Sequence, residues 1–492
     1  MSANPEPFPQ RPLAPHAGTS RISLRFAAAV VGIYLVALLV VAFAGALDAA
    51  SRQVLWPVAA TLASVAVLVL TIRWRDRFAS YFEIGVVYAG VVALYAVVPP
   101  VIAMITHFEF SPDRDGRLSA GQPTPPQVAS IIWWYAIYAA AFCAFYLLAR
   151  PRHSLPIAPD RFRGWAVPIS AAILLVVAKL FDVVVALLFG APGGTYSESY
   201  LFARGLPVLW RQMANVFQGM EITLQIVILA ALFCHYRRTK WIILIFVAAL
   251  VCWTVLRRGA RTDLAIVVIA AMQLRDLLVR RISFRAIAAA GVAGFALFLA
   301  ISVLRTESAF RMPTAEELSV SGTDFEGIFD TAYDLKYLQQ ASGAFRGKPA
   351  LLFADVAGVV PQQFLPFPKT SAALWYVITY YPTIFAEGGG LAFGVVAEAI
   401  VGYGAIELLL RGAFVGILLA LLQRWYVRGR GGVIFMAFYV WMTVMSYQMC
   451  RNTTLSIVSQ TLYRFVPAVV ATLLLAAALR RGRQLRRRLL AS

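Results

Sequence analysis

Charged residues are scarce in this chain. Asp, Glu, Lys and Arg together make up 14% of its 492 residues, whereas 60% are hydrophobic and the mean hydropathy is +0.73. Soluble globular domains carry a larger charged share and fewer apolar residues. The composition therefore excludes a soluble fold and predicts an all-α polytopic integral membrane protein.

Residues that bind metals or form disulfides are also few. The four cysteines, Cys143, Cys234, Cys252 and Cys450, all lie within apolar runs or at their ends, so they indicate neither a disulfide framework nor a metal cluster. The sequence has no P-loop and no group of His and Cys with ligand spacing. We therefore expect no metal and no cofactor.

Long apolar runs are abundant. A helix needs about 20 apolar residues to cross roughly 30 Å of hydrocarbon, and twelve runs qualify. They are residues 26–47, 54–72, 82–106, 128–149, 166–189, 214–235, 241–256, 262–279, 286–304, 391–423, 432–450 and 455–479. This count predicts a membrane domain over 23–304 with spans one to nine, a large loop over 305–390, and a second membrane part over 391–479.

The basic residues follow the positive-inside rule. With a cytoplasmic N-terminus, every second connection is basic, and 26 of the 44 Lys and Arg residues fall on one side. The net charge of +20 thus reflects topology and indicates no nucleic-acid partner. Both termini are predicted to be cytoplasmic: a proline-rich disordered tail at 1–22 and a basic tail at 480–492.

The loop at 305–390 is the one large exported connection, and it holds nine of the 24 acidic residues. Segments 325–344, 350–360 and 372–385 have the length and mixed polarity of short helices on the membrane face. Its aromatic residues include Trp375, Tyr376, Tyr380 and Tyr381. Such rings suit sugar faces, and an interfacial aromatic belt is the alternative.

A short arginine run violates the charge pattern. Arg257, Arg258 and Arg261 lie at the start of the eighth span. If each span crosses the membrane once, the connection that contains them faces the outside. A helix start attracts anions, and guanidinium groups grip phosphate oxygens at two points. We expect a pyrophosphate ligand, with lipid headgroups or pairing with Asp263 as alternatives. Further outer arginines that could join the run are Arg204, Arg211, Arg305, Arg311, Arg346 and Arg451.

Charges inside spans are costly and often functional. Lys179 with Asp182, and Glu407 with Arg411, have helical spacing and are expected to neutralise each other. Glu221 and Glu398 have no such local partner. Glu398 lies in the glycine-rich segment 388–412, which favours a broken or re-entrant helix lining a cavity, and it is the leading candidate acid.

Two segments resemble a known family. Residues 387–412, with a glycine run, Glu398 and a Gly-Tyr-Gly, and residues 257–263 are similar to segments of oligosaccharide repeat unit polymerases, the Wzy-type O-antigen polymerases. Twelve spans and a large late outer loop also fit, and the resemblance covers about 260 residues from Arg257 onward.

The resemblance implies a metal-independent glycosyltransferase of the bacterial inner membrane. Such an enzyme transfers a growing glycan from polyprenyl pyrophosphate to a lipid-linked repeat unit at the periplasmic face. It implies Glu387, Glu398 and Glu307, in that order, as candidates for the carboxylate that takes the proton of the attacking hydroxyl. The arginines above are expected to form the pyrophosphate site, and the four loop aromatics the sugar site. Expected partners are the polyprenyl-pyrophosphate-linked oligosaccharide, membrane lipid and a chain-length regulator protein. An O-antigen ligase, a flippase for lipid-linked sugar and a transferase that uses polyprenyl monophosphate sugars are the alternatives.

Overall fold

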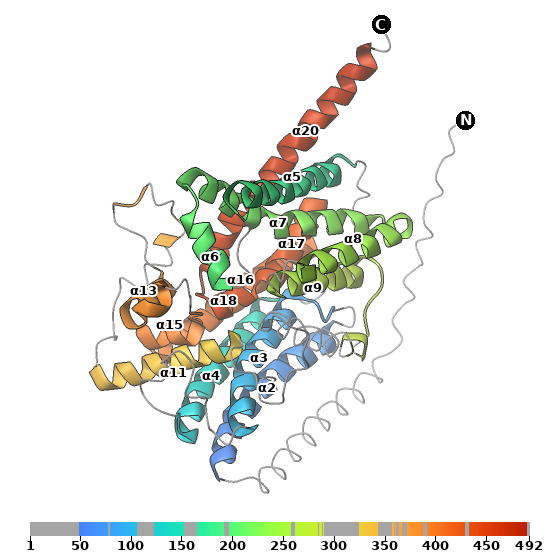
Figure 1. Cartoon of the computed structure of the whole chain (residues 1–492). Helices are drawn as coiled ribbons and strands as arrows, with labels where there is room; N and C mark the ends of the chain where they lie inside the picture. Colours follow the sequence, from blue (N-terminus) through green and yellow to red (C-terminus); the bar gives the residue numbers. More distant parts are fainter. Residues whose placement is uncertain are drawn as a thin grey trace, which may run out of the picture. The chain divides into compact units, whose positions relative to one another are not determined.

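A computed structural model describes ten stretches of the chain, residues 49–76, 79–105, 123–151, 165–190, 196–256, 261–283, 324–342, 371–386, 391–428 and 432–489, with short pieces at 285–287, 289, 357–358, 360 and 364–366. All secondary structure in these stretches is helical, which confirms the all-α fold class (Figure 1). The N-terminal tail, the expected span at 26–47 and most of the one at 286–304 lie outside the described residues.

Eight stretches of helix are long and apolar enough to cross a membrane, so the chain is a polytopic membrane protein. Six are single helices: α2 (Ala49–Arg75), α3 (Ile84–Ile105), α4 (Pro125–Ala149), α5 (Ala166–Phe189), α7 (Val208–Cys234) and α16 (Ala405–Arg428). The seventh joins α17 (Val433–Met445) to α18 (Tyr447–Arg451). The eighth joins α19 (Ser456–Gln460), a π turn η2 (Thr461–Phe465) and α20 (Val466–Leu489). Eight of the twelve expected spans are thus found.

Two more expected spans, 241–256 and 262–279, form α8 (Tyr236–Leu256) and α9 (Arg261–Leu278), but neither is among the eight. The 18 residues of α9 include Arg261, Asp263, Arg275 and Asp276. Four charged residues make a lipid-exposed span unfavourable. A short helix, α6 (Tyr196–Gly205), lies between α5 and α7.

The expected span at 391–423 is wrong as a single helix. Residues 395–401 form a separate short helix, α15 (Val395–Val401), and the span proper is α16. In the large loop, the helix expected at 325–344 is confirmed as α11 (Asp324–Ser342). The one expected at 372–385 divides into α13 (Ala372–Tyr380) and α14 (Pro382–Ala386), because Pro382 has no N–H to continue α13. Most of 350–360 lies outside the described residues.

Small residues let α4 and α16 pack at close range. A Cβ on Gly412 would lie 2.9 Å from the Tyr138 carbonyl oxygen, and one on Gly416 would lie 2.7 Å from that of Phe142. Such approaches are how helices gain van der Waals contact in lipid, where no hydrophobic effect drives them together. The two helices run in the same direction, since Gly412 meets Tyr138 and Arg424 reaches Ala149.

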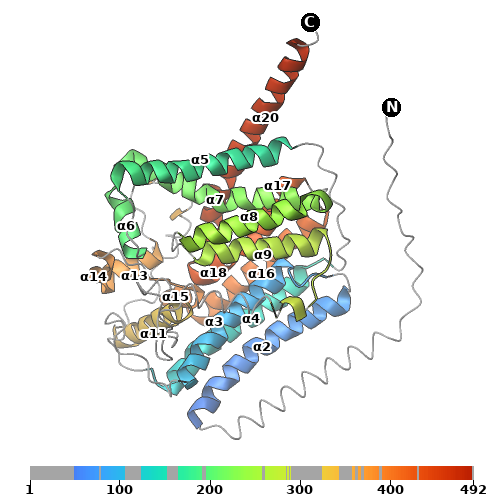
Figure 2. The same cartoon turned by 45° about the vertical axis from the view of Figure 1, so that its right-hand side comes forward.

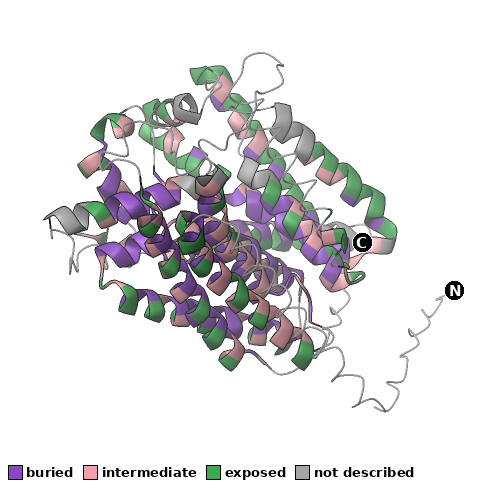
Figure 3. Ribbon diagram, turned by 90° about the horizontal axis from the view of Figure 1, so that it is seen from below, coloured by how far each residue is buried: buried purple, intermediate pink, exposed green. Residues whose placement is uncertain are grey.

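Burial separates central helices from peripheral ones. Some 78% of the apolar window in α17 and α18 and 72% of that in α7 are buried, compared with 17% of that in α5. On α5, Leu180, Leu187 and Leu188 are all more than half exposed. Figure 3 shows the buried residues in purple on the inward sides of the helices and the exposed ones in green outside. Such exposed aliphatic residues are typical of a lipid-facing surface.

One end of the bundle is held by a buried ionic network. Arg150, at the end of α4, donates from Nε to Glu83 Oε1 at 2.6 Å and from Nη2 to Asp76 Oδ2 at 3.3 Å. Tyr146 donates to the same Glu83 oxygen at 2.6 Å. Glu83 is 1% exposed and Asp76 5%, and removing one partner of such a buried pair typically costs about 3–5 kcal/mol.

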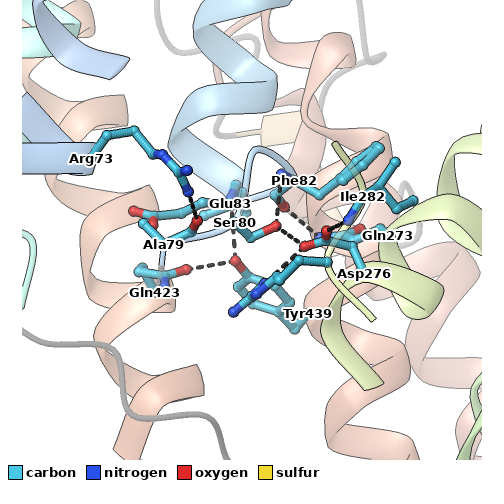
Figure 4. A network of polar contacts seen from close by, with 12 residues as sticks. Arg73, Ala79, Ser80, Phe82, Glu83, Gln273, Asp276, Ile282, Gln423 and Tyr439 are labelled. Atoms are coloured by element: carbon cyan, nitrogen blue, oxygen red, sulfur yellow. Dashed lines mark hydrogen bonds and ion pairs between the residues drawn. The ribbon is translucent and has the colours of Figure 1, made fainter. Parts of the chain in front are cut away.

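The same network reaches α9, α16 and α17. Figure 4 shows Gln273, Asp276 and Tyr439 converging on the connection between α2 and α3, where Asp276 contacts Ser80. Gln273 of α9 donates to the Phe82 carbonyl at 2.9 Å, and Tyr439 of α17 donates to Gln423 of α16 at 2.5 Å.

Four of the connections that the charge pattern assigns to one side of the membrane therefore meet in one place. We call this place, which contains Arg73, Arg150, Arg281 and Arg424, the basic end.

Candidate functional site

The large-loop helices gather at the other end of the bundle. Figure 2 shows α11, α13 and α14 together with α6 and α15, away from the connection between α2 and α3. Helix α11 contacts α3, α4 and α15. The Arg204 guanidinium of α6 stands 5.1 Å over the Phe385 ring of α14. We call this the loop end of the bundle.

A broken helix lies at the loop end. Gly394, just before α15, has φ +83, and its N–H donates to the Asn452 carbonyl at 2.9 Å. A Cβ there would come within 2.5 Å of Ile328 on α11, so the close approach of α11 also requires glycine. After α15 the chain turns through Gly402, Tyr403 and Gly404 before α16 begins. The glycine-rich stretch thus breaks the helix, as the sequence predicts.

Three charged side chains meet across this break. Glu398 of α15 forms an ion pair with Arg411 of α16, with Oε1 and Nη1 2.9 Å apart. Arg411 also donates from Nε to Glu407 Oε1 at 2.7 Å, so the predicted pair four residues apart is confirmed. The two glutamates are 7% and 6% exposed. We call Glu398, Glu407 and Arg411 the charged cluster.

Backbone and hydroxyl groups complete the charged cluster. Glu398 Oε2 accepts from the Thr454 N–H at 3.0 Å and from the Thr454 hydroxyl at 2.8 Å, while Arg411 Nη1 donates to that hydroxyl at 2.8 Å. Glu407 Oε2 accepts from the Tyr403 N–H at 2.6 Å. Both oxygens of Glu398 therefore have donors, an arrangement that stabilises the carboxylate and fixes the Arg411 guanidinium. Nothing in the sequence marks Thr454 as a partner of Glu398.

The aromatic cluster of the loop is tied to a buried acid that sequence reasoning missed. The hydroxyls of Tyr376 and Tyr381 donate to Asp334 Oδ2 of α11 at 2.6 and 2.7 Å, and Asp334 is 1% exposed. Burial, reinforced by the Asp334 charge, raises the pKa of Tyr376 well above its usual range. Tyr376 and Tyr381 are buried, whereas Trp375 and Tyr380 are half-buried and meet edge to face. Their role as a sugar site stays a prediction.

Few of the expected phosphate-binding arginines are described. Arg451 ends α18 at the loop end, one residue before the Asn452 carbonyl that binds Gly394. Arg211 of α7 donates to the Leu206 carbonyl at 2.9 Å. Arg261 begins α9, but its side chain is not described. The other expected residues, Arg257, Arg258, Arg305, Arg311, Arg346, Glu307 and Glu387, lie outside the described residues.

The length of α9 shows on which side of the bundle this helix begins. Its last turn lies in the basic end, where Asp276 accepts from the N–H of Ile282 and the guanidinium of Arg281. A straight helix of 18 residues is about 27 Å long. The backbone of Arg261 is therefore far from the basic end, on the side of the bundle where the charged cluster lies.

The charged residues of α5 and α7 also meet. Lys179 lies 3.9 Å from Asp182, as their spacing predicts, and it also pairs with Glu221 of α7. Glu221, which has no local partner in the sequence, thus finds one 42 residues earlier. This ion pair joins two membrane helices, and it lies apart from the contacts of the charged cluster.

Comparison with protein-family models, with curated proteins and with solved structures gives no match for this chain. The resemblance to repeat unit polymerases therefore stays a prediction. Among the described residues, no group of three or more His, Cys, Asp and Glu side chains could hold a metal ion.

Proposed function

We propose that this chain is a membrane glycosyltransferase that polymerises lipid-linked oligosaccharide repeat units. One observation carries the proposal: the charged cluster, the helices of the large loop and the start of α9 at Arg261 all lie away from the basic end. If basic connections face the cytoplasm, this region faces the exported lipid-linked glycan.

In the proposed reaction, a hydroxyl oxygen of the acceptor repeat unit attacks the anomeric carbon of the donor glycan. The bond from that carbon to the lipid pyrophosphate breaks, and the pyrophosphate leaves with the electron pair. Arginines of the 257–261 run stabilise the charge that develops on it. A carboxylate takes the proton of the attacking hydroxyl.

Glu398 acts in this proposal as a positioning residue. Its two oxygens already accept from Arg411 and Thr454, so taking a proton would weaken an ion pair that holds the helix break together. Glu387 and Glu307 are the candidates for the base. Trp375 and Tyr380, which keep exposed surface, are the candidates for stacking against sugar rings.

The basic end argues against a transporter. Alternating access requires one part of the bundle to rock against another, whereas the network there joins the connection between α2 and α3 to α4, α9 and α17 through buried charged and polar groups. Opening that end would break several of these contacts together. An enzyme that works from one side of the membrane needs no such opening.

Polymer ladders in cells test the proposal. In cells that lack the chromosomal copy, the wild-type chain restores long polymer. Arg258→Ala and Arg261→Ala each lower extension about 100-fold or more, the usual cost of losing a group that stabilises transition-state charge. The matched control is Arg275→Ala, an exposed arginine at the other end of α9, which leaves the ladder unchanged. Full-length polymer from both test variants would contradict the pyrophosphate role. An unchanged ladder in the deletion strain would overturn the polymerase itself.

A further inference from the structure

Lys336 is a cation in an apolar setting at the loop end. It lies on α11, and its ammonium group donates to the Ser130 hydroxyl of α4 and stands 5.4 Å over the ring of Trp134. Nearby, Tyr333 of α11 donates to the Gln127 side chain of α4 at 3.3 Å, so the two helices are joined at Tyr333 as well as at Lys336. We call Lys336, Ser130 and Trp134 the lysine seat.

Within the described residues, no carboxylate neutralises Lys336. The membrane helices that α11 packs on, α3 and α4, contain no Asp, Glu, Lys or Arg over residues 84–105 and 125–149. On α11 itself, the nearest acid along the chain, Asp334, accepts from Tyr376 and Tyr381. Glu398 of α15, which α11 also contacts, pairs with Arg411. Burial lowers the pKa of the Lys336 ammonium, as expected where water is partly excluded and no carboxylate of the described residues offsets the charge.

A partly buried cation without an acidic partner is unfavourable unless something else stabilises it. The ammonium group has three N–H donors, and one of them is used by Ser130. A bound anion could accept from the others and would remove the desolvation cost. Phosphate is well suited, since it has several strong acceptor oxygens.

The lysine seat adjoins both the charged cluster and a surface suited to lipid. A Cβ on Gly404, in the helix break, would lie 3.8 Å from Trp134 Cη2, so the ring lies between Lys336 and the break. Tyr403 beside it is 61% exposed. The first turns of α16 expose Ile406 and Leu410 by 68% and 66%. Aromatic residues at a membrane boundary above exposed aliphatic ones match a polar headgroup on an acyl or prenyl chain.

We propose that the lysine seat binds the phosphate of a second lipid-linked substrate, in addition to the one that the proposed function assigns to the arginine run at 257–261. This inference rests on the proposed function, because a polymerase must hold a donor and an acceptor at once and both are polyprenyl-linked. The polyprenyl phosphate headgroup binds Lys336 and Ser130, and its chain lies against the exposed aliphatic residues of α16.

Binding of undecaprenyl phosphate to the full chain in nanodiscs tests the lysine seat. We expect Lys336→Ala to weaken binding about 10-fold or more, the usual consequence of losing a hydrogen bond to a charged group. Lys336→Arg keeps the charge and should bind within about 3-fold of the wild type. Trp134→Phe and Ser130→Ala test the seat through milder changes, and each should weaken binding about 3- to 10-fold.

Lys240 of α8 provides a matched control. It forms the same kind of pair, 5.6 Å over the ring of Trp241, but both residues are exposed and neither contacts the loop-end helices in the described structure. Lys240→Ala should therefore leave binding unchanged. If Lys240→Ala and Lys336→Ala weaken binding equally, the attraction is general electrostatics and the lysine seat is overturned. The seat is also overturned if Lys336→Ala and Trp134→Phe each bind undecaprenyl phosphate as tightly as the wild type.

Two competition experiments distinguish a lipid-linked phosphate from the free ion and from other anionic lipids. Neither inorganic phosphate nor phosphatidylglycerol at the same concentration should displace undecaprenyl phosphate. Displacement by inorganic phosphate would show a site for the free ion, and displacement by phosphatidylglycerol a general anionic-lipid site. Either result overturns the assignment.

Failure of this inference differs from failure of the proposed function. If cells with Lys336→Ala make wild-type polymer and the purified variant binds undecaprenyl phosphate normally, the seat is wrong while the polymerase stands. If the deletion strain keeps its ladder but Lys336→Ala loses binding, the polymerase is wrong and the lipid-phosphate site stands.

Discussion

Replacing Gly402 by alanine should release the charged cluster from the helix break. An added Cβ would lie 1.8 Å from Glu407 Oε2 and 2.6 Å from its Cδ, distances that no real Cβ tolerates. The chain cannot avoid the clash cheaply, because that carboxylate is held by the Tyr403 N–H and by Arg411. The carboxylate must therefore leave, and both interactions are lost.

The size of the effect follows from burial. The side chains of Arg411 and Glu407 are 15% and 7% exposed, and breaking a buried pair by displacing one partner costs about 3–5 kcal/mol. With an unfolding entropy of about 2 cal/mol/K per residue, a chain of 492 residues should lose roughly 1 °C of Tm per kcal/mol. We therefore expect Gly402→Ala to lower Tm by about 3–5 °C.

Thermal unfolding in nanodiscs, followed by tryptophan fluorescence, measures this. Gly90→Ala in α3 is the matched control: beyond its chain neighbours and the adjacent backbone of α3, no atom lies within 4 Å of the added Cβ, so alanine should be neutral or slightly stabilising. The decisive comparison is a double-mutant cycle with Glu407→Ala. If the clash is with the carboxylate, Gly402→Ala should cost less than about 1 kcal/mol once that carboxylate is gone. The same Tm loss in both backgrounds would refute the reasoning.

Three further predictions concern the loop end. Glu398→Gln keeps the shape of the side chain but removes the ion pair with Arg411. The unfolding free energy, measured through Tm, should fall by about 2–4 kcal/mol. The control Thr454→Ser keeps the hydroxyl and should lose only about 1 kcal/mol. Asp334→Asn leaves the hydroxyls of Tyr376 and Tyr381 with a weaker acceptor, so we expect the unfolding free energy to fall by about 1–3 kcal/mol. When Asp334→Asn is added to the Tyr376→Phe, Tyr381→Phe double variant, we expect no further loss, because the hydrogen bonds are already absent.

The third prediction is a pH dependence. The pKa of the Lys336 ammonium is lowered in the free protein, and bound undecaprenyl phosphate should raise it again because the phosphate favours the charged form. The affinity for this lipid should therefore fall as pH rises through the pKa of the free protein. In Lys336→Arg the affinity should not change over this range, because guanidinium stays protonated. The acidic groups on α11 and on α15, which it contacts, are Asp324, Glu326, Asp330, Asp334 and Glu398, whereas α3 and α4 carry tyrosines but no charged residue. The pKa of Tyr333, the tyrosine three residues before Lys336, is raised, which keeps it neutral in this range.

Local spacing predicted part of the candidate site. Glu407 with Arg411 and Lys179 with Asp182 pair at four and three residues, because helical neighbours share a face. The glycine-rich segment predicted a break, and it occurs at Gly402 to Gly404. The span at 391–423 was nevertheless predicted as one helix, since hydropathy averaged over a window does not register a turn three residues long.

The sequence by itself determined the class of protein and eight of its membrane helices, because transfer into lipid depends on composition along a continuous run and not on neighbours. Only the tertiary structure decided which charges meet. Glu398 accepts from Thr454, 56 residues later in the chain, and Glu221 pairs with Lys179, 42 residues earlier. Lys336 lies over the ring of Trp134 on α4. The physical reason is that a charge in an apolar bundle must find a partner or a ligand wherever packing brings one within reach, and packing depends on the whole set of helices.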